Sequence, residues 1–68
     1  MTFIIDFERE EDGRWLAEVS GLPGVLAYGQ TSEEALTKVK TLALRVVADR
    51  LEHGEIAPDL LDISFKAA

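Results

Sequence analysis

An α+β fold is expected for this chain, with the element order β-β-β-α-β: an antiparallel sheet that carries one long helix on a single face. This expectation rests on apolar/polar alternation near both ends of the chain and on a helix start signal that follows a central Pro/Gly turn. The 68 residues contain no repeat, no low-complexity tract and no linker, so one domain spans residues 1–68. A domain this small buries only about 60% of its unfolded surface, which makes a further partner surface plausible.

Two strands joined by a short loop are expected at the amino terminus. Thr2 to Glu10 and Trp15 to Val19 both carry apolar side chains at odd positions, the period of a half-buried strand. The odd positions of the two strands face one another only if the residue numbers of each pair add up to an even number. This condition requires a loop with an odd number of residues. A three-residue loop, Glu11-Asp12-Gly13, with Gly13 in the left-handed conformation meets this requirement. The resulting pairs are Ile5 with Val19, Phe7 with Ala17 and Arg9 with Trp15.

Two further strands are expected on either side of the helix. Residues 21–24, Gly-Leu-Pro-Gly, form a turn because proline fixes φ and Gly24 accepts a positive φ. Val25 to Gln30 then forms the third strand. A fourth strand is expected after Pro58, where apolar residues alternate with polar ones: Leu61, Ile63 and Phe65.

The helix has clear signals at both ends. Thr31 and Glu34 fit a capping box, in which each side chain binds the backbone amide of the other residue, so the helix begins at Ser32. It ends near His53, because Gly54 is suited to the left-handed position after a helix. One broad face is expected to be buried: Ala35, Leu36, Val39, Leu42, Ala43, Val46, Val47 and Arg50.

Composition and charge exclude several classes of function. The chain has no cysteine, so it offers no disulfide, no thiolate metal site and no cysteine nucleophile. Thirteen acidic against seven basic residues give a net charge of −6, which repels nucleic-acid phosphates and favours a basic protein partner. No nucleophile–base pair, metal cluster or phosphate loop can be assembled, so we expect no catalytic residues, no metal and no cofactor. Neither a signal peptide nor a membrane span is indicated, which predicts a cytoplasmic protein.

Acidic residues gather on the first hairpin. The expected register places Asp6 directly opposite Glu18, with Glu8 and Glu10 on the same face, and like charges opposed on a sheet are destabilising. Three interpretations are open: a docking surface for lysines and arginines of a partner, a metal site for nuclease chemistry, or a solvated face that keeps the protein soluble. The metal interpretation is the weakest, because carboxylates that line one hairpin do not converge on a point.

Two aromatic side chains of the sequence have a structural and a functional interpretation. Trp15 is expected to stack with Arg9 as a cation–π pair, or to anchor an interface at the margin of the acidic face. His53, the only histidine, is expected at the end of the buried helix face, where it complements the helix dipole. General acid–base chemistry or metal binding would require a suitable partner close to His53, and Glu52 and Glu55 are only sequence neighbours.

A second apolar stripe on the helix predicts self-association. Leu44, Val47 and Leu51 lie away from the centre of the main buried face. Either residues 56–61 or a second copy of the chain covers this stripe. We favour the second copy, hence a homodimer or higher oligomer, because so small a domain gains most from association.

The order and spacing of several short motifs resemble the HicB family, antitoxins of bacterial toxin–antitoxin pairs, over about residues 3–58. The matching motifs are Asp12-Gly13, the aromatic Trp15, Ala17, Leu22-Pro23-Gly24, Ala27-Tyr28-Gly29 and Thr31-x-Glu33-Glu34-Ala35-Leu36. The resemblance implies a partial ribonuclease H-like core that binds and occludes a small basic HicA-type toxin, an mRNA-cleaving protein with the shape of a double-stranded-RNA-binding domain.

Two departures from the HicB pattern refine this expectation. Val25 stands where many members carry a cysteine, an exchange between small apolar residues. Typical members also carry a DNA-binding segment after the core, whereas only Lys66-Ala67-Ala68 follows the fourth strand here. We therefore expect an antitoxin-like module that does not bind nucleic acid by itself. The alternative is a homo-oligomeric HicB-like protein with another regulatory or ligand-binding role, which the absence of a neighbouring reading frame for a short basic protein would favour.

Overall fold

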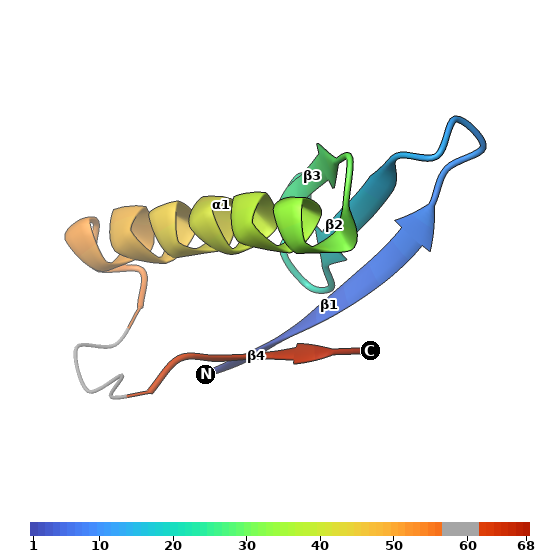
Figure 1. Cartoon of the computed structure of the whole chain (residues 1–68). Coiled ribbons are helices and arrows are strands. Elements are labelled where there is room, and N and C mark those ends of the chain that lie inside the picture. Colours follow the sequence, from blue (N-terminus) through green and yellow to red (C-terminus); the bar gives the residue numbers. More distant parts are fainter. Residues whose placement is uncertain (57–61) are drawn as a thin grey trace.

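The computed structural model describes residues 1–56 and 62–68 and confirms an α+β architecture (Figure 1). Its elements are β1 (Thr2–Arg9), β2 (Trp15–Val19), β3 (Leu26–Gly29), α1 (Ser32–Glu52) and β4 (Ser64–Ala67). The four strands form one sheet in the order β3-β2-β1-β4, with α1 on one face. Of the residues expected in the fourth strand, Leu61 lies outside the described residues.

The sheet is mixed, so the expectation of an all-antiparallel sheet is wrong for its last strand. β1 pairs with β2, and β2 with β3, in antiparallel fashion, whereas β4 pairs with β1 in parallel. The chain reverses direction between β1 and β2 and again between β2 and β3, so β3 runs in the same direction as β1. Because α1 then carries the chain back along the sheet, β4 starts near the end where β1 starts and runs in the same direction. A helical crossover of this kind is the usual connection between parallel strands.

The first hairpin has the predicted register. The paired residues include Ile5 with Val19, Phe7 with Ala17 and Arg9 with Trp15. The Glu10 amide donates to the Arg14 carbonyl at 2.8 Å, which closes a three-residue loop, and Gly13 has a φ of +89°. A side chain at position 13 would therefore be strained.

The ends of α1 are set by local hydrogen bonds. Thr31 Oγ1 accepts from the Glu34 amide at 3.0 Å, which confirms the first half of the capping box. The Glu34 carboxylate does not complete the box, because it accepts from Lys38 Nζ at 3.0 Å one turn later. At the other end Gly54 has a φ of +69°, and the amides of Gly54 and Glu55 donate to the carbonyls of Leu51 and Arg50. This pattern is a Schellman motif.

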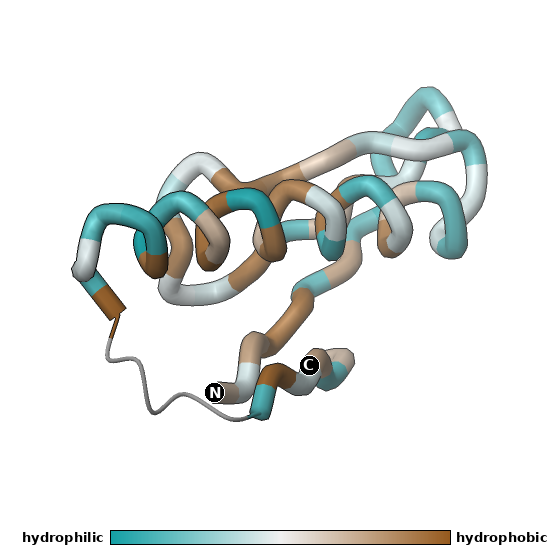
Figure 2. Tube along the Cα trace, turned by 90° about the vertical axis from the view of Figure 1, so that its left-hand side faces the viewer, coloured by the Kyte–Doolittle hydropathy of each residue, from teal (hydrophilic) through white to brown (hydrophobic). Residues whose placement is uncertain are grey.

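The core lies between α1 and the face of the sheet that α1 covers, which we call the inner face. The buried members are Phe3, Ile5, Ala17, Val19, Leu22, Val25, Ala27, Ala35, Val39, Ala43 and Val47. A helix about 10 Å across spans only about two strands that lie about 4.8 Å apart, and α1 packs mainly on β2 and β3. β1 and β4, which adjoin the two ends of the chain, lie side by side in the other half of the sheet (Figure 1, Figure 2).

Phe7 is the core prediction that the structure corrects. It lies on the inner face, but its side chain is 36% exposed. The reason is the limited width of α1, which leaves Phe7 at the rim of a small hollow of about 110 Å³ beside Leu36, Lys40 and Phe65. Ile5, two residues earlier on the same strand, is 1% exposed.

Candidate protein-binding surface

The face of the sheet opposite α1, which we call the outer face, carries the predicted carboxylates. Asp6 and Glu18 are directly paired, Glu8 follows on β1, and all three side chains are exposed. Ser20 Oγ donates to Asp6 Oδ2 at 2.6 Å. This hydrogen bond partly offsets the repulsion expected between the two opposed carboxylates. The structure thus brings together three of the four residues predicted to bind a partner.

The outer face also carries exposed apolar side chains that the sequence analysis missed. Ile4, Leu26 and Tyr28 are 37–39% exposed, and Leu16 is half-buried. Glu18 pairs with Leu26, and Leu16 pairs with Tyr28, so carboxylates and apolar groups are next to one another. A signal was present in residues 25–28, Val-Leu-Ala-Tyr, where the third strand is apolar on both faces.

Arg14 lies at the hairpin end of the outer face, where it contacts Tyr28 and Asp12. Its guanidinium carbon lies 4.4 Å from the centroid of the Tyr28 ring, and its Nε donates to Asp12 Oδ2 at 2.7 Å. The Arg14 amide donates to Asp12 Oδ1 at 3.0 Å. This amide hydrogen bond, followed by the guanidinium bond, lowers the pKa of the Asp12 carboxyl from its ordinary value of 3.8. The charge of Arg14 is therefore engaged at the hairpin tip. Lys66, which pairs with Ile4, is a second basic residue of the outer face, and among the described residues no ion pair involves Asp6, Glu8 or Glu18.

Trp15 lies on the inner face, on the side of the sheet opposite the carboxylates. It packs against the core, and the Arg9 guanidinium carbon lies 5.6 Å from its ring centroid, as the cation–π interpretation predicted. Trp15 alternates with Leu16, whose side chain points to the outer face. The structure therefore does not group Trp15 with Asp6, Glu8 and Glu18, and its role in binding stays a prediction.

The second stripe of α1 consists of two surface residues. Leu44 and Leu51 are 45% and 44% exposed, whereas Val47 is 3% exposed and belongs to the core. Ile56 is half-buried and packs against the core. A role in self-association for Leu44 and Leu51 stays a prediction, and Val47 has too little exposed surface to share it.

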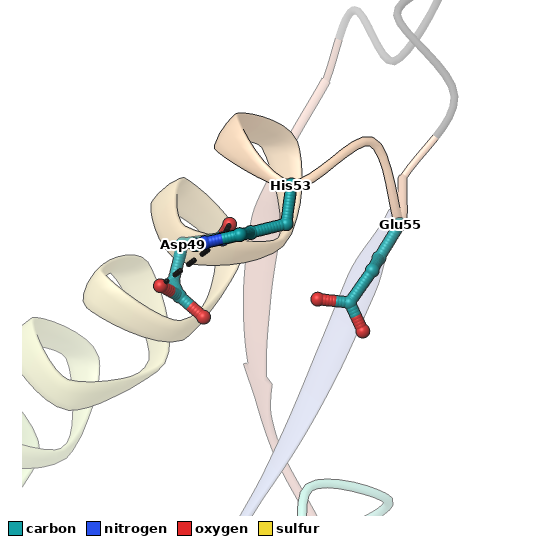
Figure 3. Close-up of side chains that lie close together, drawn as sticks. All are labelled: Asp49, His53 and Glu55. Carbon is teal, nitrogen blue, oxygen red and sulfur yellow. Dashed lines mark hydrogen bonds and ion pairs between the residues drawn. The ribbon is translucent and has the colours of Figure 1, made fainter.

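Asp49, His53 and Glu55 lie close together at the carboxyl end of α1 (Figure 3). His53 is exposed, contrary to its expected place on the buried face, because it is the cap residue beyond the last helical turn. Its Nδ1 lies 2.7 Å from the Asp49 main-chain oxygen and 3.4 Å from Asp49 Oδ1. Sequence reasoning found Glu55 only as a neighbour and missed Asp49, although the spacing of four residues was visible. All three residues are exposed, and capping of the helix dipole explains His53, so we assign no metal to this group.

In the part of the chain that the structure describes, no helix is both long and apolar enough to cross a lipid bilayer.

The fold and the outer face define a small α+β domain with a mixed acidic and apolar sheet surface. The chain is similar to the UPF0150 protein Ta0767 of Thermoplasma acidophilum, with 29% identity over 58 residues, which are 85% of this chain and 84% of that protein. The similarity thus extends over most of both chains. No family model and no solved structure matches the chain.

Proposed function

We propose that this protein is an antitoxin-like interaction module that binds and neutralises a small basic ribonuclease of the HicA type. The outer face is the binding surface, with Asp6, Glu8 and Glu18 as its charged residues. The resemblance to HicB antitoxins supports the class of partner, and the similarity to a UPF0150 protein extends over most of the chain. The module acts by covering the toxin and not by chemistry of its own.

The observation that carries this proposal is the mixture of side chains on the outer face. A sheet face that serves only solubility carries mainly charged and polar residues, and an isolated exposed apolar side chain on such a face needs no explanation. Here Ile4, Leu26 and Tyr28 are exposed beside three carboxylates on one sheet surface. Such an arrangement resembles a protein interface, in which apolar and aromatic groups supply most of the affinity and charges supply orientation.

Occlusion follows from the chemistry of an RNA-cleaving partner. A protein that binds RNA must expose lysines and arginines to the phosphates. Carboxylates on a rigid sheet can take the place of those phosphates, and opposite charges speed association when the ionic strength is low. The apolar residues of the outer face then exclude water from the contact, which slows dissociation.

Charge reversal at Asp6, Glu8 and Glu18 is expected to slow association with the product of the adjacent short basic reading frame. Replacing the three residues by lysine should lower the association rate by at least about tenfold at 50 mM salt, and by less at 500 mM salt because screening shortens the range of the field. Surface plasmon resonance at the two salt concentrations measures the rates, and circular dichroism checks the fold.

A matched variant carries Asp49→Lys, Glu52→Lys and Glu55→Lys, which change the net charge by the same amount at the carboxyl end of α1, away from the outer face. All three residues are exposed. This variant should keep most of the wild-type association rate. Equal binding by the wild type and the outer-face variant would refute the proposed surface, as would an equal loss in both variants.

A further inference from the structure

We propose that a second copy of this chain pairs with the free edge of β4 in antiparallel fashion, so that two four-stranded sheets join into one of eight strands. The proposal is independent of the toxin partner, because it concerns the edge of the sheet and not the outer face. It rests on the hydrogen-bonding pattern of β4, on the side chains at its edge and on the amount of surface that the single chain leaves exposed.

β4 presents unpaired backbone groups on one side. The amides of Ser64 and Ala68 donate to the carbonyls of Met1 and Ile5 in β1, both at 2.9 Å. Because alternate residues of a strand direct their backbone groups to the same side, those of Phe65 and Ala67 point away from β1. β4 is the last strand in the sheet order, so nothing in the described residues pairs with this edge. An uncovered edge of this kind is a template for another strand.

The side chains along this edge are complementary to those of a second, antiparallel β4. With Phe65 opposite Phe65 of the second copy, Ile63 lies opposite Ala67, and Ser64 lies opposite Lys66. This antiparallel register forms apolar pairs on the inner face, and it keeps each lysine away from its symmetry mate. Lys66 is the single charged residue in the range 63–68, so the net charge of −6 is not concentrated at this edge. Of the outer-face carboxylates, Asp6 and Glu8 lie on β1, the neighbour of β4, and Glu18 lies on β2, so none of the three is on the edge strand itself.

The inner face next to this edge is only partly covered. The Phe3 and Phe65 rings lie 5.6 Å apart, and Lys40 Nζ lies 5.6 Å from the Phe65 ring centroid. The flank of α1 that bears Lys40 therefore faces β4. Leu44 lies one turn and Leu51 three turns further along this flank, and both are exposed, as is Ile63 at 39%.

The surface area indicates how strong such a dimer is. The chain exposes 4709 Å², whereas a compact monomer of 7.5 kDa exposes about 4,200 Å². The single chain thus leaves roughly 500 Å² more surface exposed than a compact monomer, and a contact along the four residues of β4 is small beside the roughly 800 Å² per partner of a stable interface, so a weak dimer is expected. The two-fold axis of this dimer is perpendicular to the sheet, so the outer faces of both copies lie on the same side.

Proline at position 67 tests the edge directly. Ala67→Pro removes the outward amide and leaves the bonds from Ser64 and Ala68 to β1 in place. Ala67→Val is the matched control, because valine has a similar size and keeps the amide. Sedimentation equilibrium between 5 and 500 μM should show self-association of the wild type and the valine variant. The proline variant should associate at least about tenfold more weakly. A wild type that stays monomeric throughout, or a proline variant that associates like the wild type, overturns the proposal.

Cysteine pairing tests the register and does not depend on the stability of the proline variant, since the natural chain has no cysteine. Ser64→Cys and Lys66→Cys proteins, mixed under mild oxidation, should form the mixed disulfide in excess over both homodisulfides. The reason is that directly opposed residues outside the hydrogen-bonded pairs have Cα atoms about 4.5 Å apart, within disulfide range. Mass spectrometry identifies the products. A statistical mixture, or an excess of either homodisulfide, contradicts the proposed pairing.

Discussion

Replacing Ile5 with alanine is expected to lower the free energy of unfolding by about 2–5 kcal/mol, whereas replacing Phe7 with alanine lowers it by only about 1–2 kcal/mol. The order is the reverse of what side-chain size alone predicts. Ile5 is 1% exposed in the centre of the core, and Phe7 is 36% exposed at its rim. A chain of this length has a total stability of only about 3–10 kcal/mol, so the Ile5 variant should be partly unfolded in buffer.

Urea titration followed by Trp15 fluorescence measures both variants, with circular dichroism as a second probe of unfolding. The Ile4→Ala variant is a matched control, because Ile4 is the neighbouring residue on the outer face and is 38% exposed. It should lose about 1 kcal/mol. A larger loss at Phe7 than at Ile5 would show that α1 covers Phe7 as well as Ile5, contrary to the exposed fractions of the two side chains.

Replacing Gly29 with alanine is expected to be the second severe change, with a loss of about 3 kcal/mol or more. Gly29 ends β3 just before α1. A Cβ atom there would lie 2.5 Å from the Ala35 amide nitrogen and 2.9 Å from the Thr31 carbonyl oxygen. Both are backbone atoms of the first helical turn, so the added methyl group displaces the helix start from the sheet. The cause is lack of space and not an unusual backbone angle.

The next residue supplies the control for this prediction. Gln30 is exposed, and Gln30→Ala should change the free energy of unfolding by less than about 0.5 kcal/mol. Thermal or urea unfolding compares the two variants. A Gly29→Ala protein as stable as the Gln30→Ala protein would mean that the first turn of α1 does not pack closely on β3.

Local signals in the sequence predicted the hairpin and the helix accurately. Loop parity and Gly13 determine the register of β1 and β2, and Thr31 and Gly54 mark the ends of α1. These features depend on residues a few positions apart, whose geometry is limited by backbone sterics and hydrogen bonding. The side chain of Glu34 was harder to predict, because Lys38 competes for its carboxylate.

Features that depend on distant parts of the chain were predicted less well. The parallel direction of β4 follows from counting chain reversals, a step that alternation within the strand does not contain. The exposure of Phe7 depends on which strands α1 covers. No periodicity along β1 distinguishes Phe7 from Ile5, because both occupy odd positions of the same strand.

The sequence predicted the charged residues of the candidate site but not its apolar residues. Asp6, Glu8 and Glu18 were found because alternation places them on the face opposite the core. Leu26 and Tyr28 were missed because β3 has apolar residues on both faces, and such a run is equally typical of a strand that is simply buried. Only the sheet order shows that these residues share a surface with the carboxylates.

Methyl-resolved NMR tests the central claim, that the outer face binds a basic protein, most directly. The chain is labelled at isoleucine and leucine methyl groups and titrated with the unlabelled product of the adjacent basic reading frame. Binding at the outer face should cause shift changes or broadening for Ile4, Leu16 and Leu26, and little change for Leu44 and Leu51 on α1. Changes confined to the α1 methyl groups, or unchanged spectra at saturating partner concentrations, would contradict it.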